Sequence, residues 1–260
     1  MKPIFDTLQQ DFGNNIVVTV IDIDELTDEL KGFVDNNLVA VCEGSGSNSS
    51  VEEVKEIVQE LFKNKENKKD KDKYSNWEMG AVAEFFAHLY LTSIGLKQEF
   101  MFLNVEERSV KKGFDGYYTD NADQWVMESK SGSIETEGIS HNSKLNEAID
   151  DLGKKISGKV KNNPWRNAYN HAQLIDVKSA EDVRDYLKQM SKDFRKKEFK
   201  LEEFNIIPCA TIYYENTEFS KKEDVAAAVS DVIKPGEKKV HLVCVSSRSV
   251  GVFKNYMGIK

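Results

Sequence analysis

The chain has 260 residues, with 36 Lys and Arg against 44 Asp and Glu, and a formal net charge of −8. This charge argues against a protein that coats DNA over its whole surface, and no apolar run approaches the roughly 20 residues needed to span a bilayer. We therefore expect a cytoplasmic protein without a membrane partner, long enough for one or two hydrophobic cores.

The charge is unevenly distributed along the chain. Residues 1–60 carry 13 acidic residues and 3 lysines, whereas residues 154–200 carry 13 Lys or Arg and 6 acidic residues. The basic segment could follow nucleic-acid phosphates or form a solvated face of helices. The acidic segment could dock a partner or keep nucleic acid away. Three cysteines without a Cys-x-x-Cys spacing favour buried thiols over a disulfide scaffold or a zinc site.

The first 62 residues predict an alternation of strands and helices. We expect strands at Ile16–Asp22 and Leu38–Cys42, and helices at Asp24–Val34 and Val51–Phe62, the latter capped by Ser50. The Gly- and Ser-rich loop at residues 44–50 has neither of the common phosphate-binding glycine patterns and is interpreted as a surface loop.

Residues 63–73 are charged and contain no apolar side chain, so we expect a mobile loop or a domain boundary there. The prediction is therefore an N-terminal α/β segment at residues 1–70, which could dock or regulate a partner, and a second domain at residues 75–260.

The second domain is predicted to mix helices and strands. Helices are expected at Ser75–Ile94, Asn142–Ile156 and Ser220–Ile233, and over Ala168–Lys197 with an interruption near residue 178. Strands are expected at Gln98–Val105, Phe114–Thr119, Gln124–Lys130, Asn205–Tyr214 and Lys239–Ser246, the second and third as a hairpin. This order predicts an α/β sandwich around a mixed sheet.

One set of residues in the hairpin carries recognisable chemistry. Asp115 lies in Gly113-Phe-Asp-Gly116, and Glu128 and Lys130 follow in the second strand. Side chains alternate across a strand, so Glu128 and Lys130 share one face. Asp115, Glu128 and the carbonyl of Ser129 could ligate Mg²⁺ or Mn²⁺, while Lys130 could position or deprotonate a water molecule or offset charge on a phosphate.

Glu84 is a further candidate, because a carboxylate within an otherwise apolar helix needs a reason. Glu78 competes for this place, although an acid near a helix start also favours the helix dipole. His88, one turn after Glu84, could approach the site or be a core residue, and His141 could touch phosphate. Trp165 and Arg166 suit stacking or phosphate contact, or Trp165 is simply buried.

The Asp115 … Glu128-Ser129-Lys130 pattern, preceded by a helix with Glu84, resembles the PD-(D/E)XK nuclease superfamily. The resemblance implies a restriction-endonuclease-like sandwich in which the Asp and Glu bind the metal and Lys130 assists catalysis. Phe114 stands where the superfamily name has proline.

More narrowly, Gly80-x-x-x-Glu84, the Gly113–Gly116 turn and the Glu-Ser-Lys strand resemble the HamA family of the Hachiman antiphage defence system. This implies a metal-dependent DNA nuclease held in check by a helicase subunit of the HamB kind. The alternative is a non-catalytic adaptor that keeps the nuclease fold, which the acidic N-terminal segment would favour.

Overall fold

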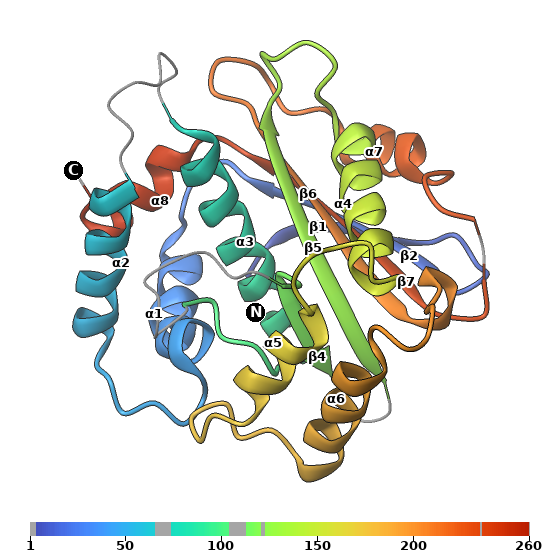
Figure 1. Ribbon diagram of the computed structural model, residues 1–260. Helices are drawn as coiled ribbons and strands as arrows, with labels where there is room; N and C mark the ends of the chain where they lie inside the picture. Colours follow the sequence, from blue (N-terminus) through green and yellow to red (C-terminus); the bar gives the residue numbers. More distant parts are fainter. Residues whose placement is uncertain (1–3, 66–73, 104–112, 121–122, 235, 260) are drawn as a thin grey trace.

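A computed structural model describes residues 4–65, 74–103, 113–120, 123–234 and 236–259. Its centre is a seven-stranded mixed sheet in the order β1-β2-β7-β6-β5-β4-β3 (Figure 1). The strands are β1 Asp6–Asp11, β2 Ile16–Ile23, β3 Lys97–Gln98, β4 Gly116–Thr119, β5 Gln124–Ser133, β6 Asn205–Tyr213 and β7 Val240–Ser247. The predicted α/β class with a mixed sheet is confirmed.

The middle of the sheet is parallel and its two edges are antiparallel. Strands β2, β7, β6 and β5 run parallel, whereas β1 pairs antiparallel with β2, and β4 with β5. Every residue of β6 is buried, as expected for a parallel strand covered on both faces. The predicted hairpin of β4 and β5 is confirmed, and it forms the boundary between parallel and antiparallel pairing.

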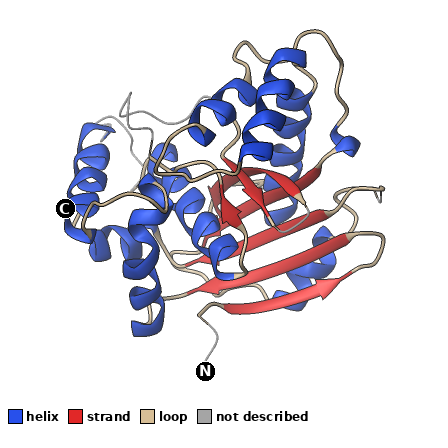
Figure 2. Ribbon diagram, turned by 90° about the horizontal axis from the view of Figure 1, so that it is seen from below, coloured by secondary structure: helices blue, strands red, loops and turns tan. Residues whose placement is uncertain are grey.

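Helices cover both faces of the sheet (Figure 2). One face carries the helices α1 Asp28–Glu43, α2 Val51–Lys65, α3 Asn76–Ser93 and α8 Val250–Met257, and the other carries α4 His141–Ile156, α5 Pro164–Ala172, α6 Glu181–Asp193 and α7 Lys222–Val229. Two hydrophobic clusters, one on each side of the sheet, form the core.

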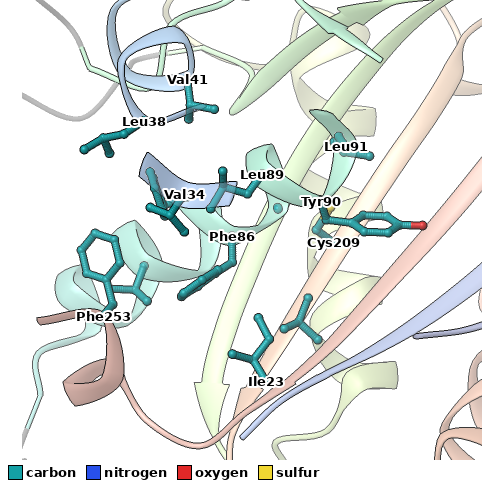
Figure 3. Close-up of a cluster of buried hydrophobic side chains, with 14 of the residues drawn as sticks. Ile23, Val34, Leu38, Val41, Phe86, Leu89, Tyr90, Leu91, Cys209 and Phe253 are labelled. Carbon is teal, nitrogen blue, oxygen red and sulfur yellow. The ribbon is translucent and has the colours of Figure 1, made fainter. Parts of the chain in front are cut away.

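Helix α3 is the central helix of its face. Its N-terminus is fixed by a capping box in which the Ser75 hydroxyl accepts from the Glu78 N–H, while the Glu78 carboxylate accepts from the Ser75 N–H. Eleven of its residues are buried, because α1 and α8 cover it on one side and the sheet on the other. Figure 3 shows Phe86 of α3 between Val34 of α1 and Ile23 of β2.

Two sequence predictions in this region are wrong. Leu38–Cys42 is the last part of α1, which runs from Asp28 to Glu43. Leu38, Val41 and Cys42 are buried against α3, so an apolar run that suggested a strand is instead the inner face of a helix. The strand predicted at Gln98–Val105 is limited to Lys97–Gln98; residues 99–103 lie outside strand structure, and residues 104 and 105 lie outside the described residues.

The N-terminal segment shares this sheet, since β2 pairs with β7 over eight residues. Residues 66–73 hold most of the predicted loop or boundary and lie outside the described residues. The functional division at residue 70 stays a prediction. None of the helices within the described ranges is long and apolar enough to cross a membrane.

Candidate active site

The predicted hairpin brings Asp115 and Glu128 together. The N–H of Asp115 donates to the Met127 carbonyl at 3.1 Å, and the Asp115 carboxylate accepts from the N–H of Ser129 at 2.8 Å. Asp115 directly precedes Gly116, which pairs with Met127, so its carboxylate lies against β5 beside Glu128 and Ser129.

The glycines around Asp115 are needed for close packing. A Cβ on Gly116 would lie 2.6 Å from the Tyr118 ring, and a Cβ on Gly113 would lie 2.8 Å from the Asn167 amide nitrogen. Neither glycine has positive φ. Residues 113–116 can therefore pack closely against β5 and α5, which places Asp115 beside β5.

The Ser129 carbonyl is oriented to support the predicted ligand set. In an extended strand, the N–H and C=O of one residue point to the same side. Because the Ser129 N–H points to the Asp115 carboxylate, its carbonyl points toward the same side of β5. Two carboxylates and a carbonyl are oxygen donors of the kind that Mg²⁺ and Mn²⁺ prefer, and water molecules complete such a shell.

Glu128 is almost completely buried, with 1% of its surface exposed. Its two carboxylate oxygens bind different lysines: Lys130 at 3.0 Å from Oε1, and Lys155 of α4 at Oε2. Lys130 also pairs with Asp151 of α4 at 2.6 Å. The predicted Glu128–Lys130 pair is therefore extended by two residues of the helix that covers this face.

Sequence reasoning missed Asp151 and Lys155. They lie at i and i+4, on one side of a helix whose apolar residues pack on the sheet beside Glu128. This spacing, in the helix that follows the Glu-x-Lys strand, is a signal that could have found them.

Burial and neighbouring carboxylates raise the pKa of Asp115. Burial, and then the charges of Glu128 and Glu84, raise the pKa of Asp115 to about 8, although Lys155 and the Ser129 N–H act in the opposite direction. Burial also raises the pKa of Glu128, against the effect of its two lysines. The site is thus a group of acids crowded in a poorly solvated place, where a bound cation would relieve their repulsion.

The pKa of Lys130 shifts so as to favour the charged form of this side chain. Burial alone would lower the pKa of this lysine, but Glu128 and Asp151 outweigh burial and raise it. Lys130 is therefore protonated at neutral pH. It can stabilise negative charge, whereas it would act poorly as a base that removes a proton from water.

Glu84 of α3 reaches the same group from the other face of the sheet. It is 9% exposed, and its charge contributes to the raised pKa of Asp115. Its Oε1 lies 3.4 Å from Nε2 of the fully buried His88, whose Nδ1 contacts the Tyr118 hydroxyl. A neutral His88 that donates from Nε2 accepts the Tyr118 proton at Nδ1, so this chain orients Glu84.

The competing candidates lie elsewhere. Glu78 caps α3 and pairs with Lys254 at 2.8 Å. His141 is buried against Tyr214 with its Nε2 at 3.2 Å from the Val245 carbonyl, and burial lowers its pKa to about 4. Trp165 is buried on Phe114, with ring centres 4.8 Å apart, while Arg166 is exposed. Asp115, Glu128, Lys130 and Glu84 are thus the predicted residues that the fold groups together.

A metal ion at this site would be held by two carboxylates and not by a closed set of three or more side chains. Among the residues that the structure describes, no three His, Cys, Asp or Glu side chains are arranged to hold a metal ion. Lysines occupy the Glu128 oxygens instead. The donor set of Asp115, Glu128 and the Ser129 carbonyl fits a partly hydrated hard cation that competes with these lysines.

A search of curated proteins gives no match. The model of the family described as HamA matches residues 2–257, nearly the whole chain, and so includes the carboxylate site and both edges of the sheet. The chain therefore belongs to the HamA family, whose members are components of the Hachiman antiphage defence system.

Proposed function

We propose that this protein is a metal-dependent nuclease of the PD-(D/E)XK type and that it cuts DNA during antiphage defence. The observation that carries the proposal is the convergence of Asp115, Glu128 and Lys130 at the β4–β5 hairpin, with Glu84 close by. Membership of the HamA family supports the defence role.

Each residue has a definite task in this proposal. Asp115, Glu128 and the Ser129 carbonyl would hold the ion, and Glu84 would be an auxiliary ligand to metal or water. Mg²⁺ or Mn²⁺ held there would supply Lewis-acid polarisation of the scissile phosphate and a more acidic water. Lys130 remains protonated and stabilises the charge that builds on the phosphate oxygens, while Asp151 holds its ammonium group in place.

The proposal includes a helicase partner. An active nuclease must be restrained in its own cell, and a helicase subunit of the HamB kind is the expected restraint. The strongly acidic residues 1–60 are a candidate docking region for it, because their exposed carboxylates would repel DNA.

Plasmid and single-strand cleavage with Mg²⁺ or Mn²⁺ tests the nuclease. We expect metal-dependent cutting by the wild type, loss of cutting on addition of EDTA, and loss in a Glu128→Ala/Lys130→Ala variant. Thermal denaturation with and without Mn²⁺ checks that the variant is folded and whether it still binds metal.

The competing function is a non-catalytic adaptor. An adaptor would show neither cutting nor a rise of melting temperature with Mg²⁺ or Mn²⁺, whether alone or after release from its helicase partner. Equal cutting by wild type and the double variant would instead refute the assignment of the site.

A further inference from the structure

A group of exposed cations lies along the connection between α4 and α5, on the α4 face of the sheet. Residues 154–166 contain five Lys or Arg and no acidic residue, in a chain whose net charge is −8. We define the basic rim as the exposed members of this segment with one residue of the neighbouring helix end: Lys154, Lys159, Lys161, Arg166 and Arg195.

Contacts at both ends fix the segment beside the site. At its start, Lys155 reaches into the site and binds Glu128. At its end, Trp165 packs on Phe114, the residue before Asp115, and Asn167 lies against Gly113. The connection between α4 and α5 must therefore pass over the hairpin that carries the carboxylates, as Figure 1 shows in front of β5.

The connection is also held by α6. The Arg195 guanidinium donates to the Lys161 carbonyl at 2.6 Å, and the Asn163 side chain donates to the Ser191 carbonyl at 2.9 Å. A Cβ on Gly158 would lie 3.2 Å from the Phe194 carbonyl oxygen, so the loop lies close to the end of α6. These bonds place Arg195 next to the loop lysines and give the rim a fixed backbone.

The ion pairs of the rim leave most of its charge available. Lys154 pairs with the exposed Asp150 and with Asp151, which also binds Lys130. Asp193, the acid nearest in sequence to Arg195, pairs with Lys197. No acidic partner is found within 4 Å of Lys159, Lys161, Arg166 or Arg195 among the described residues.

We infer that the basic rim binds the phosphate backbone of DNA and guides the strand to Asp115 and Glu128. The inference rests on the proposed nuclease function. Its support is charge complementarity: a local excess of cations on an otherwise acidic protein attracts a polyanion to one place and leaves the remaining surface repulsive. The basic segment at residues 154–200 had two interpretations from sequence, a nucleic-acid contact or a solvated face of helices. The inference assigns part of this segment to nucleic-acid contact.

The test compares two triple variants with the same change of net charge. The rim variant is Lys159→Gln/Lys161→Gln/Arg166→Gln. The control variant is Lys31→Gln/Lys63→Gln/Lys65→Gln, three exposed lysines of α1 and α2 on the opposite face of the sheet. Substitutions at exposed positions of this kind usually change the free energy of unfolding by less than about 0.5 kcal/mol. Circular dichroism and melting temperature confirm that both variants fold.

Binding is measured by fluorescence anisotropy with a labelled DNA duplex in EDTA, at 50 to 200 mM salt, so that no cutting interferes. We expect at least tenfold weaker binding by the rim variant than by the control. Loss of three phosphate contacts should also lower the slope of log K against log salt by about 2 to 3. Equal losses of affinity and slope in the two variants would overturn the inference.

The binding result and the cleavage result are separable. Metal-dependent cutting with no difference between the rim and control variants would refute DNA binding by the rim and leave the proposed nuclease function intact. Rim-dependent DNA binding without cutting by the protein, alone or freed from its partner, would remove the nuclease and with it the guiding role that we infer for the rim.

Discussion

Two buried glutamates with lysine partners lie in neighbouring parts of the sheet, and they differ in what surrounds them. Glu99, directly after β3, and Glu128 of β5 are each 1% exposed. Glu99 accepts hydrogen bonds from Lys97 at 2.9 Å, from the Thr119 hydroxyl at 2.7 Å and from the Ser179 hydroxyl. Its neighbours are donors, so its charge is satisfied within the protein.

Glu128 has two lysines, but it also faces Asp115, whose pKa it raises. Burial of a carboxylate is thus common to both places, whereas crowding of carboxylates distinguishes Glu128. A satisfied buried acid joins secondary-structure elements, and a crowded one stores unfavourable electrostatic energy that a cation can relieve. The surroundings thus distinguish a structural glutamate from the one that we propose as a metal ligand, without any reference to sequence motifs.

The largest expected effect comes from removing one charge at each place. Glu128→Gln should reduce DNA cleavage by on the order of 10²-fold or more, because the metal loses a charged ligand. Glu99→Gln should leave the rate per folded molecule unchanged. Cleavage rates of both purified variants, corrected for the folded fraction, provide the measurement. A comparable loss of cleavage in both variants would show that the two glutamates do not differ in function.

Asp115→Asn should change how stability depends on pH. The pKa of Asp115 is raised from 3.8 to about 8, so the folded state keeps a proton that the unfolded chain has lost between these values. The wild type therefore loses stability as pH rises from about 4 to about 8. In EDTA, the variant should be more stable than wild type at pH 8 to 9, by on the order of a few kcal/mol, and equal to it near pH 4.

Denaturant titrations across this pH range measure the difference. A gain in stability that is the same at every pH would mean that burial and the neighbouring acids do not raise the pKa of Asp115. Added Mn²⁺ should reduce the difference, because the ion stabilises only the wild-type carboxylate.

Glu99→Gln should mainly destabilise the fold. The neutral amide weakens the contact with Lys97 and places an NH₂ group where donors already converge, which costs about 1–3 kcal/mol. Urea denaturation measures this as a lower midpoint with an unchanged slope. Stability equal to wild type would show that the Glu99 network is not required for folding.

Ser179→Ala should have the smallest effect. The hydroxyl donates one hydrogen bond to a carboxylate that keeps two other donors, so we expect a loss of about 0.5–1.5 kcal/mol and no change in cleavage. The same urea titration applies. A loss larger than that of Glu99→Gln would show that Ser179 stabilises the α5–α6 connection by another route.

Sequence patterns predicted the elements that carry the site because those elements have strong periodicity. Alternation placed Glu128 and Lys130 on one face, and the apolar stripes of α3 and α4 set their extents to within a residue or two. They failed where periodicity was ambiguous. The run Leu38–Cys42 is too short to distinguish a strand from a buried helix, and β1, a mostly exposed polar edge strand, gave no signal.

The sequence by itself determined the strongly periodic elements around the site and that Glu128 and Lys130 share a face, because backbone geometry fixes the positions of residues close in the chain. Only the tertiary structure decided that Lys155 and Asp151 reach Glu128 and Lys130, and that Trp165 packs beside Asp115. These contacts join residues 21 to 51 positions apart in the chain. The packing of helices on a sheet brings them together, and no local pattern encodes it.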